Sequence, residues 1–194
     1  MGVKKTFMKY TSILYLLSIT IIYTFIATAI SINEWFRWTK NALSDLGSPY
    51  AQYPWVFNVG LIVGGILGVP FMISLITYFK GKITKIGAVL GVISLMFLIL
   101  IGMFPEGTTL HEPVSYLFFL TMFVAILAMG YGLIFEGYTK RGIFGVILST
   151  FSFFLAMGNQ YWSIAIREII GALGMTIWFT CLSYYLLKNE SAHY

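Results

Sequence analysis

Residues 55–104 read WVFNVGLIVGGILGVPFMISLITYFKGKITKIGAVLGVISLMFLILIGMF, which is two apolar runs joined by a short basic stretch. Each run, Trp55–Phe79 and Ile86–Phe104, is about as long as the ~20 helical residues that cross a hydrocarbon core. The stretch between them, Lys80–Lys85, is long enough only for a tight connection. The segment therefore predicts two antiparallel transmembrane helices, and the rest of the chain repeats this pattern.

Apolar runs fill most of the chain. Hydrophobic residues make up 59% of it and charged residues only 10%, whereas ordinary globular domains carry ~25% charged residues. In a bilayer the backbone must satisfy its own polar groups, as helices or a closed barrel, and these runs lack the alternation of barrel strands. We therefore predict an all-α polytopic membrane protein, a single integral membrane domain over residues 1–194 with a six-transmembrane-helix bundle. The expected helices are about Tyr10–Ile32, Trp55–Phe79, Ile86–Phe104, Pro113–Phe135, Ile143–Met157 and Ile164–Leu187.

The basic residues favour alternate connections between the runs. Nine of the twelve fall on one side of a six-span topology, together with both chain ends. Positive residues are retained in the cytoplasm during insertion, so we expect both termini to be cytoplasmic and the protein to lie in the cytoplasmic (plasma) membrane. This sidedness accounts for the net charge of +5, and we expect no nucleic-acid partner. The nine are Lys4, Lys5, Lys9, Lys80, Lys82, Lys85, Lys140, Arg141 and Lys188.

Ionisable residues gather in the three connections on the opposite, outer side. Charged groups near the bilayer edge are costly unless paired, so this concentration predicts a polar mouth. Structural explanations compete: Thr109 and Glu112 fit a capping box, and Arg167 can snorkel to headgroups with Glu168 as its solvated neighbour. As ligand-binding residues of the mouth we expect Asp45, Asn58, Glu106, His111, Arg167 and Glu168.

Aromatic residues recur through the longest outer connection, Asn33–Pro54. Tryptophan and tyrosine prefer the headgroup zone, so this segment should rest on the outer interface or fold back into it. Its Ser44–Pro49 part predicts a helix stop followed by a turn. We expect Trp35, Trp55 and Trp162 to frame the mouth.

Metal and cofactor sites have little support in the sequence. Zinc needs three or four nitrogen, sulfur or carboxylate ligands, and only one of the two histidines, His111, lies on the outer side. The single cysteine, Cys181, cannot form a CxxC pair. We expect no bound metal and no cofactor.

Glycines recur every fourth residue in the second run, at Gly60, Gly64 and Gly68. Small residues let helix backbones approach each other closely in a membrane. We expect this strip to pack against another helix of the same chain. The alternative is a seam with a membrane-protein partner or a second copy.

Short motifs follow one another in a fixed order from Asn41 to Leu187. They are Asn41-Ala-Leu-Ser44-Asp45-Leu-Gly47, Phe57-Asn58-Val-Gly60, Gly102-Met-Phe-Pro105-Glu106 with His111 a few residues on, and Arg167-Glu168 with Trp178. In this order the chain resembles the prokaryotic membrane family called domain of unknown function 998. The resemblance implies a six-span integral membrane protein without an established reaction, and its pattern falls on Ser44, Asp45, Gly47, Asn58, Pro105, Glu106 and His111. The Ser-Asp-Leu-Gly segment is also similar to the six-span Frag1/DRAM/Sfk1 group, whose members are linked to lipid remodelling or distribution.

These observations favour a protein that binds or handles a lipid headgroup or another amphiphile at the outer mouth, with membrane lipids as its partners. One alternative is an intramembrane hydrolase or transferase in which Glu106 and His111 are the catalytic candidates, since histidine exchanges protons near neutral pH. Another is a structural subunit of a membrane assembly. Whether the protein is an enzyme is left open by the residues alone.

Overall fold

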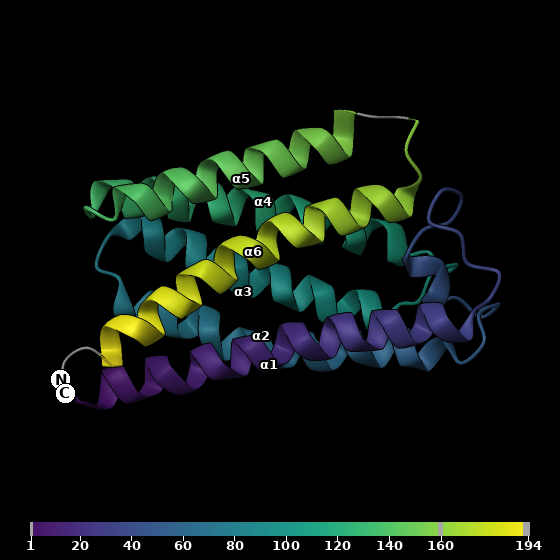
Figure 1. The fold of residues 1–194 in the computed structure, drawn as a ribbon, viewed down its shortest axis with the longest axis horizontal. Coiled ribbons are helices and arrows are strands. Elements are labelled where there is room, and N and C mark those ends of the chain that lie inside the picture. The colour runs from purple at the N-terminus through teal and green to yellow at the C-terminus, as the bar shows by residue number, and fades with distance from the viewer. Residues whose placement is uncertain (1, 159–160, 192–194) are drawn as a thin grey trace.

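The computed structural model describes residues 2–158 and 161–191, and this part of the chain is a helical bundle (Figure 1). Within it, six helices are each long and apolar enough to cross a membrane, so the predicted all-α membrane fold is confirmed. The helices are α1 (Gly2–Ile32), α2 (Pro54–Tyr78), α3 (Lys82–Met103), α4 (His111–Phe135), α5 (Thr139–Gly158) and α6 (Ile164–Ser191), with a 3₁₀ helix, η1 (Ser44–Gly47), between α1 and α2. The side chains of Lys4 and Lys5, which entered the charge comparison, lie outside the described residues.

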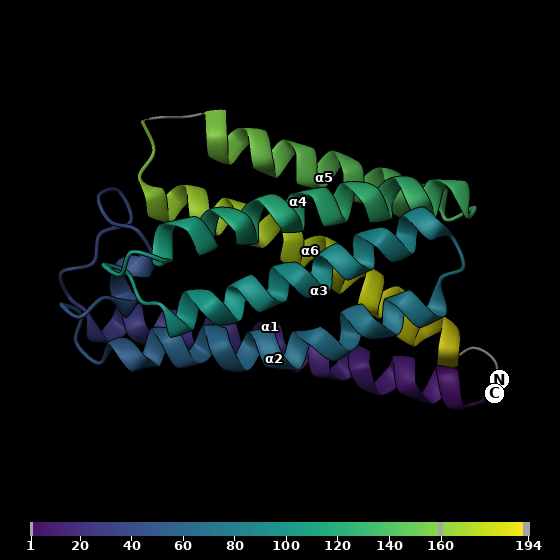
Figure 2. The same cartoon turned by 180° about the vertical axis from the view of Figure 1, so that it is seen from behind.

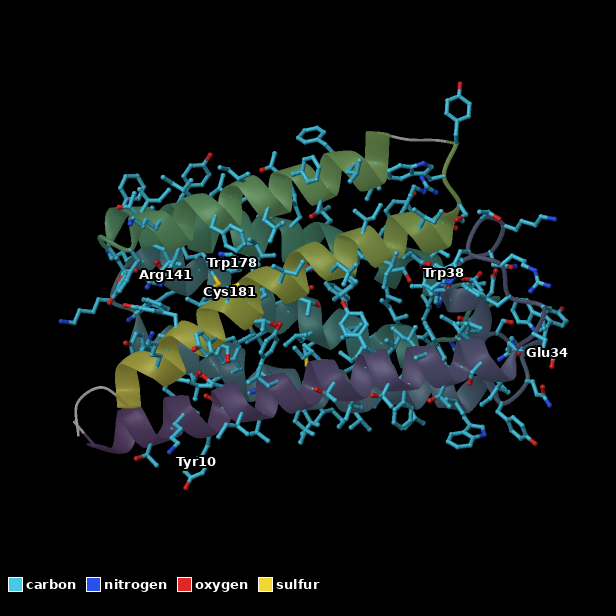
Figure 3. The ribbon with its side chains drawn as sticks, in the orientation of Figure 1. Tyr10, Glu34, Trp38, Arg141, Trp178 and Cys181 are labelled. Carbon is cyan, nitrogen blue, oxygen red and sulfur yellow. The ribbon has the colours of Figure 1, made fainter. Side chains whose placement is uncertain are left out.

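The helices run back and forth along one axis, so the connections collect at two ends. α1 begins and α6 ends at the same end of the bundle, and the α1–α2 and α3–α4 connections lie at the other end, which we call the mouth end (Figure 1). Glu34 and Trp38 mark the mouth end, and Arg141 lies toward the opposite end (Figure 3). Seen from behind, α6 crosses the bundle diagonally behind α3 and α2 (Figure 2). It reaches α1, where the Ser183 hydroxyl donates to the Ser12 carbonyl at 3.4 Å.

α5 begins at Thr139, earlier than the predicted start at Ile143. The reason is the sharp turn after α4. Gly137 takes a φ of +87°, which glycine adopts without steric cost, and the Tyr138 N–H bonds to the Leu133 carbonyl at 2.8 Å. The chain thus reverses within a few residues, and the next helix starts at once.

The glycine strip of α2 is covered by helices of the same chain. A Cβ added at Gly64 would lie 2.2 Å from Cγ1 of Ile22 on α1, and one at Gly68 would lie 3.1 Å from a methyl group of Leu95 on α3. This is the packing within the chain that the spacing suggested. A partner or a second copy stays a prediction, and it would need a contact surface other than this strip.

At the end opposite the mouth, Glu136, the residue that follows α4, links two connections through hydrogen bonds. Its carboxylate accepts the Lys80 N–H at 2.9 Å and the Thr84 hydroxyl, and both donors belong to the α2–α3 region. Gly81 lies against the same side chain, where a Cβ would approach Glu136 to 2.4 Å. The α2–α3 connection is therefore fixed to the end of α4.

We predict that Gly87→Ala destabilises the bundle. A Cβ at Gly87 would lie 2.6 Å from the Met129 nitrogen and 2.7 Å from the Ala125 oxygen, which are backbone atoms of α4 that cannot rotate away. Overpacking of this kind costs ~1–3 kcal/mol, so the thermal unfolding midpoint of the detergent-solubilised protein should fall. Gly158→Ala is the matched control because, among the described residues and apart from its own helix turn, no atom lies within 4 Å of its added Cβ. Equal midpoints for the two variants would contradict the close α3–α4 contact.

Candidate functional site

A cavity of about 350 Å³, which we call the mouth cavity, opens among α4, α5 and α6 at the mouth end. This volume lies at the lower end of the ~300–1,000 Å³ typical of small-molecule sites. Its lining on α4 runs from His111 to Ile126, about 22 Å along the helix at ~1.5 Å per residue. The polar lining consists of Ser44, Asp45, Glu106, His111, Glu112, Arg167 and Glu168 near the mouth, with Ser115, Ser149 and Ser152 on the helix walls.

The α1–α2 connection folds back over the mouth cavity and is hydrogen-bonded to the start of α6. The Leu43 N–H donates to Oε2 of Glu168 at 2.6 Å, and the Ala165 N–H donates to the Asn41 carbonyl at 2.9 Å. Leu43 and its neighbour Ser44 are buried. Glu168 is therefore not the solvated neighbour of Arg167 that we considered, because its carboxylate holds the connection in place.

Asp45 shapes the segment that enters η1. Its Oδ2 accepts the Ala42 N–H at 2.9 Å and the Asn41 side-chain amide at 3.3 Å. The predicted helix stop and turn at Ser44–Pro49 is a single 3₁₀ turn, followed by extended backbone at Ser48. Asp45 also lines the mouth cavity.

Asn58, which we expected in the ligand-binding set, supports η1 and does not line the mouth cavity. Its side-chain amide donates to the Gly47 carbonyl at 2.9 Å. A Cβ at Gly47 would lie 2.2 Å from Oδ1 of Asn58, so only glycine allows this approach. The hydrogen bond from the Asn58 side-chain amide thus fixes η1 to the beginning of α2.

Glu106 and His111 are joined directly, with 3.0 Å between Oε2 and Nε2. The Ser44 hydroxyl donates to the same Glu106 oxygen at 2.9 Å. The His111 side chain is 6% exposed and that of Glu106 38%, so the pair spans the boundary between the protein interior and the mouth. On the other face of the ring, Nδ1 lies 2.8 Å from the Phe104 carbonyl oxygen.

These contacts fix how many protons the Glu106–His111 pair carries. A carbonyl oxygen can only accept, so Nδ1 of His111 must carry the hydrogen that it donates to Phe104. The Nε2–Oε2 contact then needs one further proton, held either by the imidazole or by the carboxyl group. In both cases the pair has zero net charge and one proton available for exchange.

The same geometry differs from a serine nucleophile relay. In such relays the serine and the acid contact opposite nitrogens of the histidine ring. Here Ser115 Oγ, at 3.3 Å, and Glu106 share Nε2 of His111. The arrangement suits hydrogen bonding to a ligand or proton exchange better than activation of Ser115.

Arg167 lines the mouth cavity from the first turn of α6. Its Nε atom is buried and has no hydrogen-bond partner among the described residues. A buried donor without an acceptor is costly, and native structures rarely keep one. An acceptor supplied by a bound molecule would remove this cost.

Two other features of the mouth concern its helix cap and its aromatic residues. α4 begins at His111 after Leu110, without a side-chain cap, so Thr109 does not form a capping box with Glu112. Glu112 instead lines the mouth cavity. The lining also contains none of the three expected tryptophans, and its aromatic residues are Tyr116, Phe119, Phe123 and Phe153.

The deeper part of the cavity is apolar, and we did not predict it from the sequence. Its floor and walls include Phe119, Phe123, Ile126, Phe153 and Met175. A signal was present on α5, where the small residues Gly145, Ser149, Ser152 and Ala156 share one buried face. That face approaches α6, because Cβ atoms at Gly145 and Gly174 would meet Trp178 and Ser152.

The rim of the cavity is apolar and exposed. Tyr116 is 64% exposed, Met157 50% and Ile164 51%, and they come from α4, α5 and α6 in turn. In membrane-spanning helices such side chains face lipid. In the described ranges, no group of three or more histidine, cysteine or carboxylate residues is placed to hold a metal ion.

We predict that Glu168→Ala loosens η1. The substitution leaves the buried Leu43 N–H without its acceptor, which costs ~1–3 kcal/mol and should raise amide hydrogen exchange of residues 42–47 about tenfold. Glu34→Ala, which removes an exposed carboxylate of the same connection, is the control and should leave exchange unchanged. Unaltered exchange in Glu168→Ala would contradict the role of this bond.

A comparison with protein families places the chain among proteins without an assigned activity. The model of the family described as protein of unknown function (DUF998) matches residues 16–185, which reach from α1 to α6. The comparisons with curated proteins and with solved structures found no match. The similarity to the Frag1/DRAM/Sfk1 group stays a prediction.

Proposed function

The chain belongs to the DUF998 family of proteins of unknown function, and we propose that it binds the headgroup of a lipid or another amphiphile at the mouth of its bundle. One observation carries the proposal: a single cavity joins a charged mouth to an apolar interior among α4, α5 and α6. An amphiphile needs both environments, one for each of its parts. A purely water-soluble ligand would leave the apolar part of the cavity unfilled.

The charged residues support a headgroup that carries charges of both signs. A phosphate or carboxylate oxygen would accept the unpaired Nε–H of Arg167 in a charge-assisted hydrogen bond. Asp45 and Glu112 also line the cavity, and their two carboxylates outnumber this cation. The Glu106–His111 pair does not change this balance of negative and positive charges, because its own net charge is zero. An ammonium group beside the anionic group would match these carboxylates.

The apolar lining supports a hydrocarbon part of the ligand. Phe119, Phe123 and Phe153 lie below the polar mouth, and burial of hydrocarbon against such side chains is favourable by ~0.8 kcal/mol for each CH₂ group. The exposed rim of Tyr116, Met157 and Ile164 lets a ligand keep contact with the surrounding lipid.

We place the mouth on the extracytoplasmic side of the cytoplasmic membrane. The support is the positive charge at the opposite end, where Lys80, Lys82 and Lys85 surround the α2–α3 connection and Lys140 and Arg141 open α5. Basic residues beside short connections are retained in the cytoplasm. Both termini then lie in the cytoplasm.

We predict that Arg167→Gln and Asp45→Asn reduce the amount of lipid that the protein retains. Loss of a charge-assisted hydrogen bond costs ~1.5–3 kcal/mol, so affinity should fall about 10- to 100-fold in Arg167→Gln. Native mass spectrometry of protein extracted with its lipids measures the bound fraction. Lys40→Gln is the control, since Lys40 is exposed and does not line the cavity. Unchanged lipid retention in both cavity variants would refute the proposal.

We predict that a cysteine at Thr109 is labelled from outside the cell. Both Thr109, before α4, and Thr139, at the start of α5, are exposed and lie at opposite ends of the bundle. In a Cys181→Ser background, a membrane-impermeant maleimide should label Thr109→Cys on intact cells, and Thr139→Cys only after permeabilisation. The reverse pattern would put the mouth in the cytosol.

A further inference from the structure

A second cavity of about 130 Å³, which we call the inner cavity, lies inside the bundle, lined by α1, α2, α3, α4 and α6. It is not separate from the mouth cavity. Some side chains line both of them, so the partition between the two is one side chain thick. The shared residues are Ser44, Ser115, Phe119, Glu168 and Met175.

The polar groups around the inner cavity already have partners. The Ser18 hydroxyl donates to the Gly64 carbonyl at 2.7 Å. The Tyr23 hydroxyl lies 3.0 Å from the Thr176 hydroxyl, and the Tyr15 hydroxyl donates to the Thr176 carbonyl at 3.3 Å. Ser44, Ser115 and Glu168 are hydrogen-bonded to Glu106, His111 and the Leu43 N–H, respectively. The remaining lining is apolar, which favours hydrocarbon in this space.

The size and depth of the inner cavity fit the end of one hydrocarbon chain. Its volume is close to the ~150 Å³ of an apolar cavity that holds benzene, which corresponds to about six carbons. Its lining on α6 runs from Glu168 to Phe179, about 16 Å along the helix. One leaflet contributes roughly 15 Å to the ~30 Å hydrocarbon core. A chain that starts at the mouth would therefore end in the inner cavity near the middle of the bilayer.

We propose that the inner cavity is a subsite for the terminal part of the ligand's hydrocarbon chain, which passes between Phe119 of α4 and Met175 of α6. The proposal rests on the proposed function, because the same ligand holds its headgroup at the mouth. The ligand class is an amphiphile with at least one unbranched chain long enough to reach from Arg167 to the level of Phe179.

Two photoreactive lipids test this path in the full-length protein. Both are single-chain phosphocholines, one with a diazirine next to the ester carbonyl and one with a diazirine at the chain end. We expect the first to crosslink to residues near the mouth that line only the mouth cavity, such as Ala156 and Gly171. The second should crosslink to inner-cavity residues such as Leu61, Met72 and Phe179.

A substitution that fills the inner cavity should selectively lower crosslinking of the chain-end probe to the residues of that cavity. Ala172 lines the inner cavity, and Ala172→Phe is expected to lower chain-end crosslinking there at least tenfold while crosslinking of the carbonyl-proximal probe persists. Leu173→Phe is the matched control, since Leu173 is the next residue and is exposed on the outside of α6. Ile19→Phe fills the same space from α1 and serves if Ala172→Phe does not elute as a monodisperse protein.

The outcomes separate the two proposals. If neither probe crosslinks to the mouth cavity, the proposed function is wrong. If the carbonyl-proximal probe labels the mouth cavity but the chain-end probe labels only outward-facing residues such as Leu117 and Leu173, the function stands and the inner subsite is wrong. Equal chain-end labelling in Ala172→Phe and in the unmodified protein would also overturn the subsite.

Discussion

A backbone N–H that is buried at the level of the headgroups must find an acceptor in the protein, and Leu43 finds it in the Glu168 carboxylate. This bond attaches the α1–α2 connection to α6. Because η1 follows directly, Ser44 lies where its hydroxyl reaches Glu106, and Glu106 in turn contacts His111 at the start of α4. The Leu43–Glu168 bond thus acts with the Ala165–Asn41 and Asn58–Gly47 bonds to position the polar end of the mouth cavity.

The polar side chains of the mouth differ in how fully they are satisfied. Asp45, Glu106 and Glu168 each accept a hydrogen bond from their own chain, and these bonds hold them in place before any ligand arrives. Arg167 differs from them, because its buried Nε–H has no hydrogen-bond partner among the described residues. Groups held in position lose little entropy on binding, which favours affinity, and the unpaired donor adds a preference for an anionic acceptor.

The helices, their order and the convergence of charge at the mouth could be predicted because hydrophobic run length and charge placement report directly on the bilayer. The roles of single residues could not. Asn58 and Asp45 both looked like ligand-binding residues. The Asn58 side-chain amide, however, donates its hydrogen bond to the Gly47 carbonyl, and no local sequence pattern reveals this contact between two segments. The apolar depth of the cavity was missed for a related reason. Phe119 and Phe153 are ordinary membrane residues in the sequence, and only the approach of α5 and α6 sets them around a space.

The exposed rim formed by Tyr116, Met157 and Ile164 determines how a ligand reaches the mouth cavity. A ligand that enters past these side chains arrives sideways by two-dimensional diffusion within the leaflet, without first dissolving in water. Occupancy would then follow the mole fraction of the amphiphile among its neighbours in the bilayer, and total aqueous concentration would matter little. A soluble analogue that has the same headgroup but no chain should be a poor competitor.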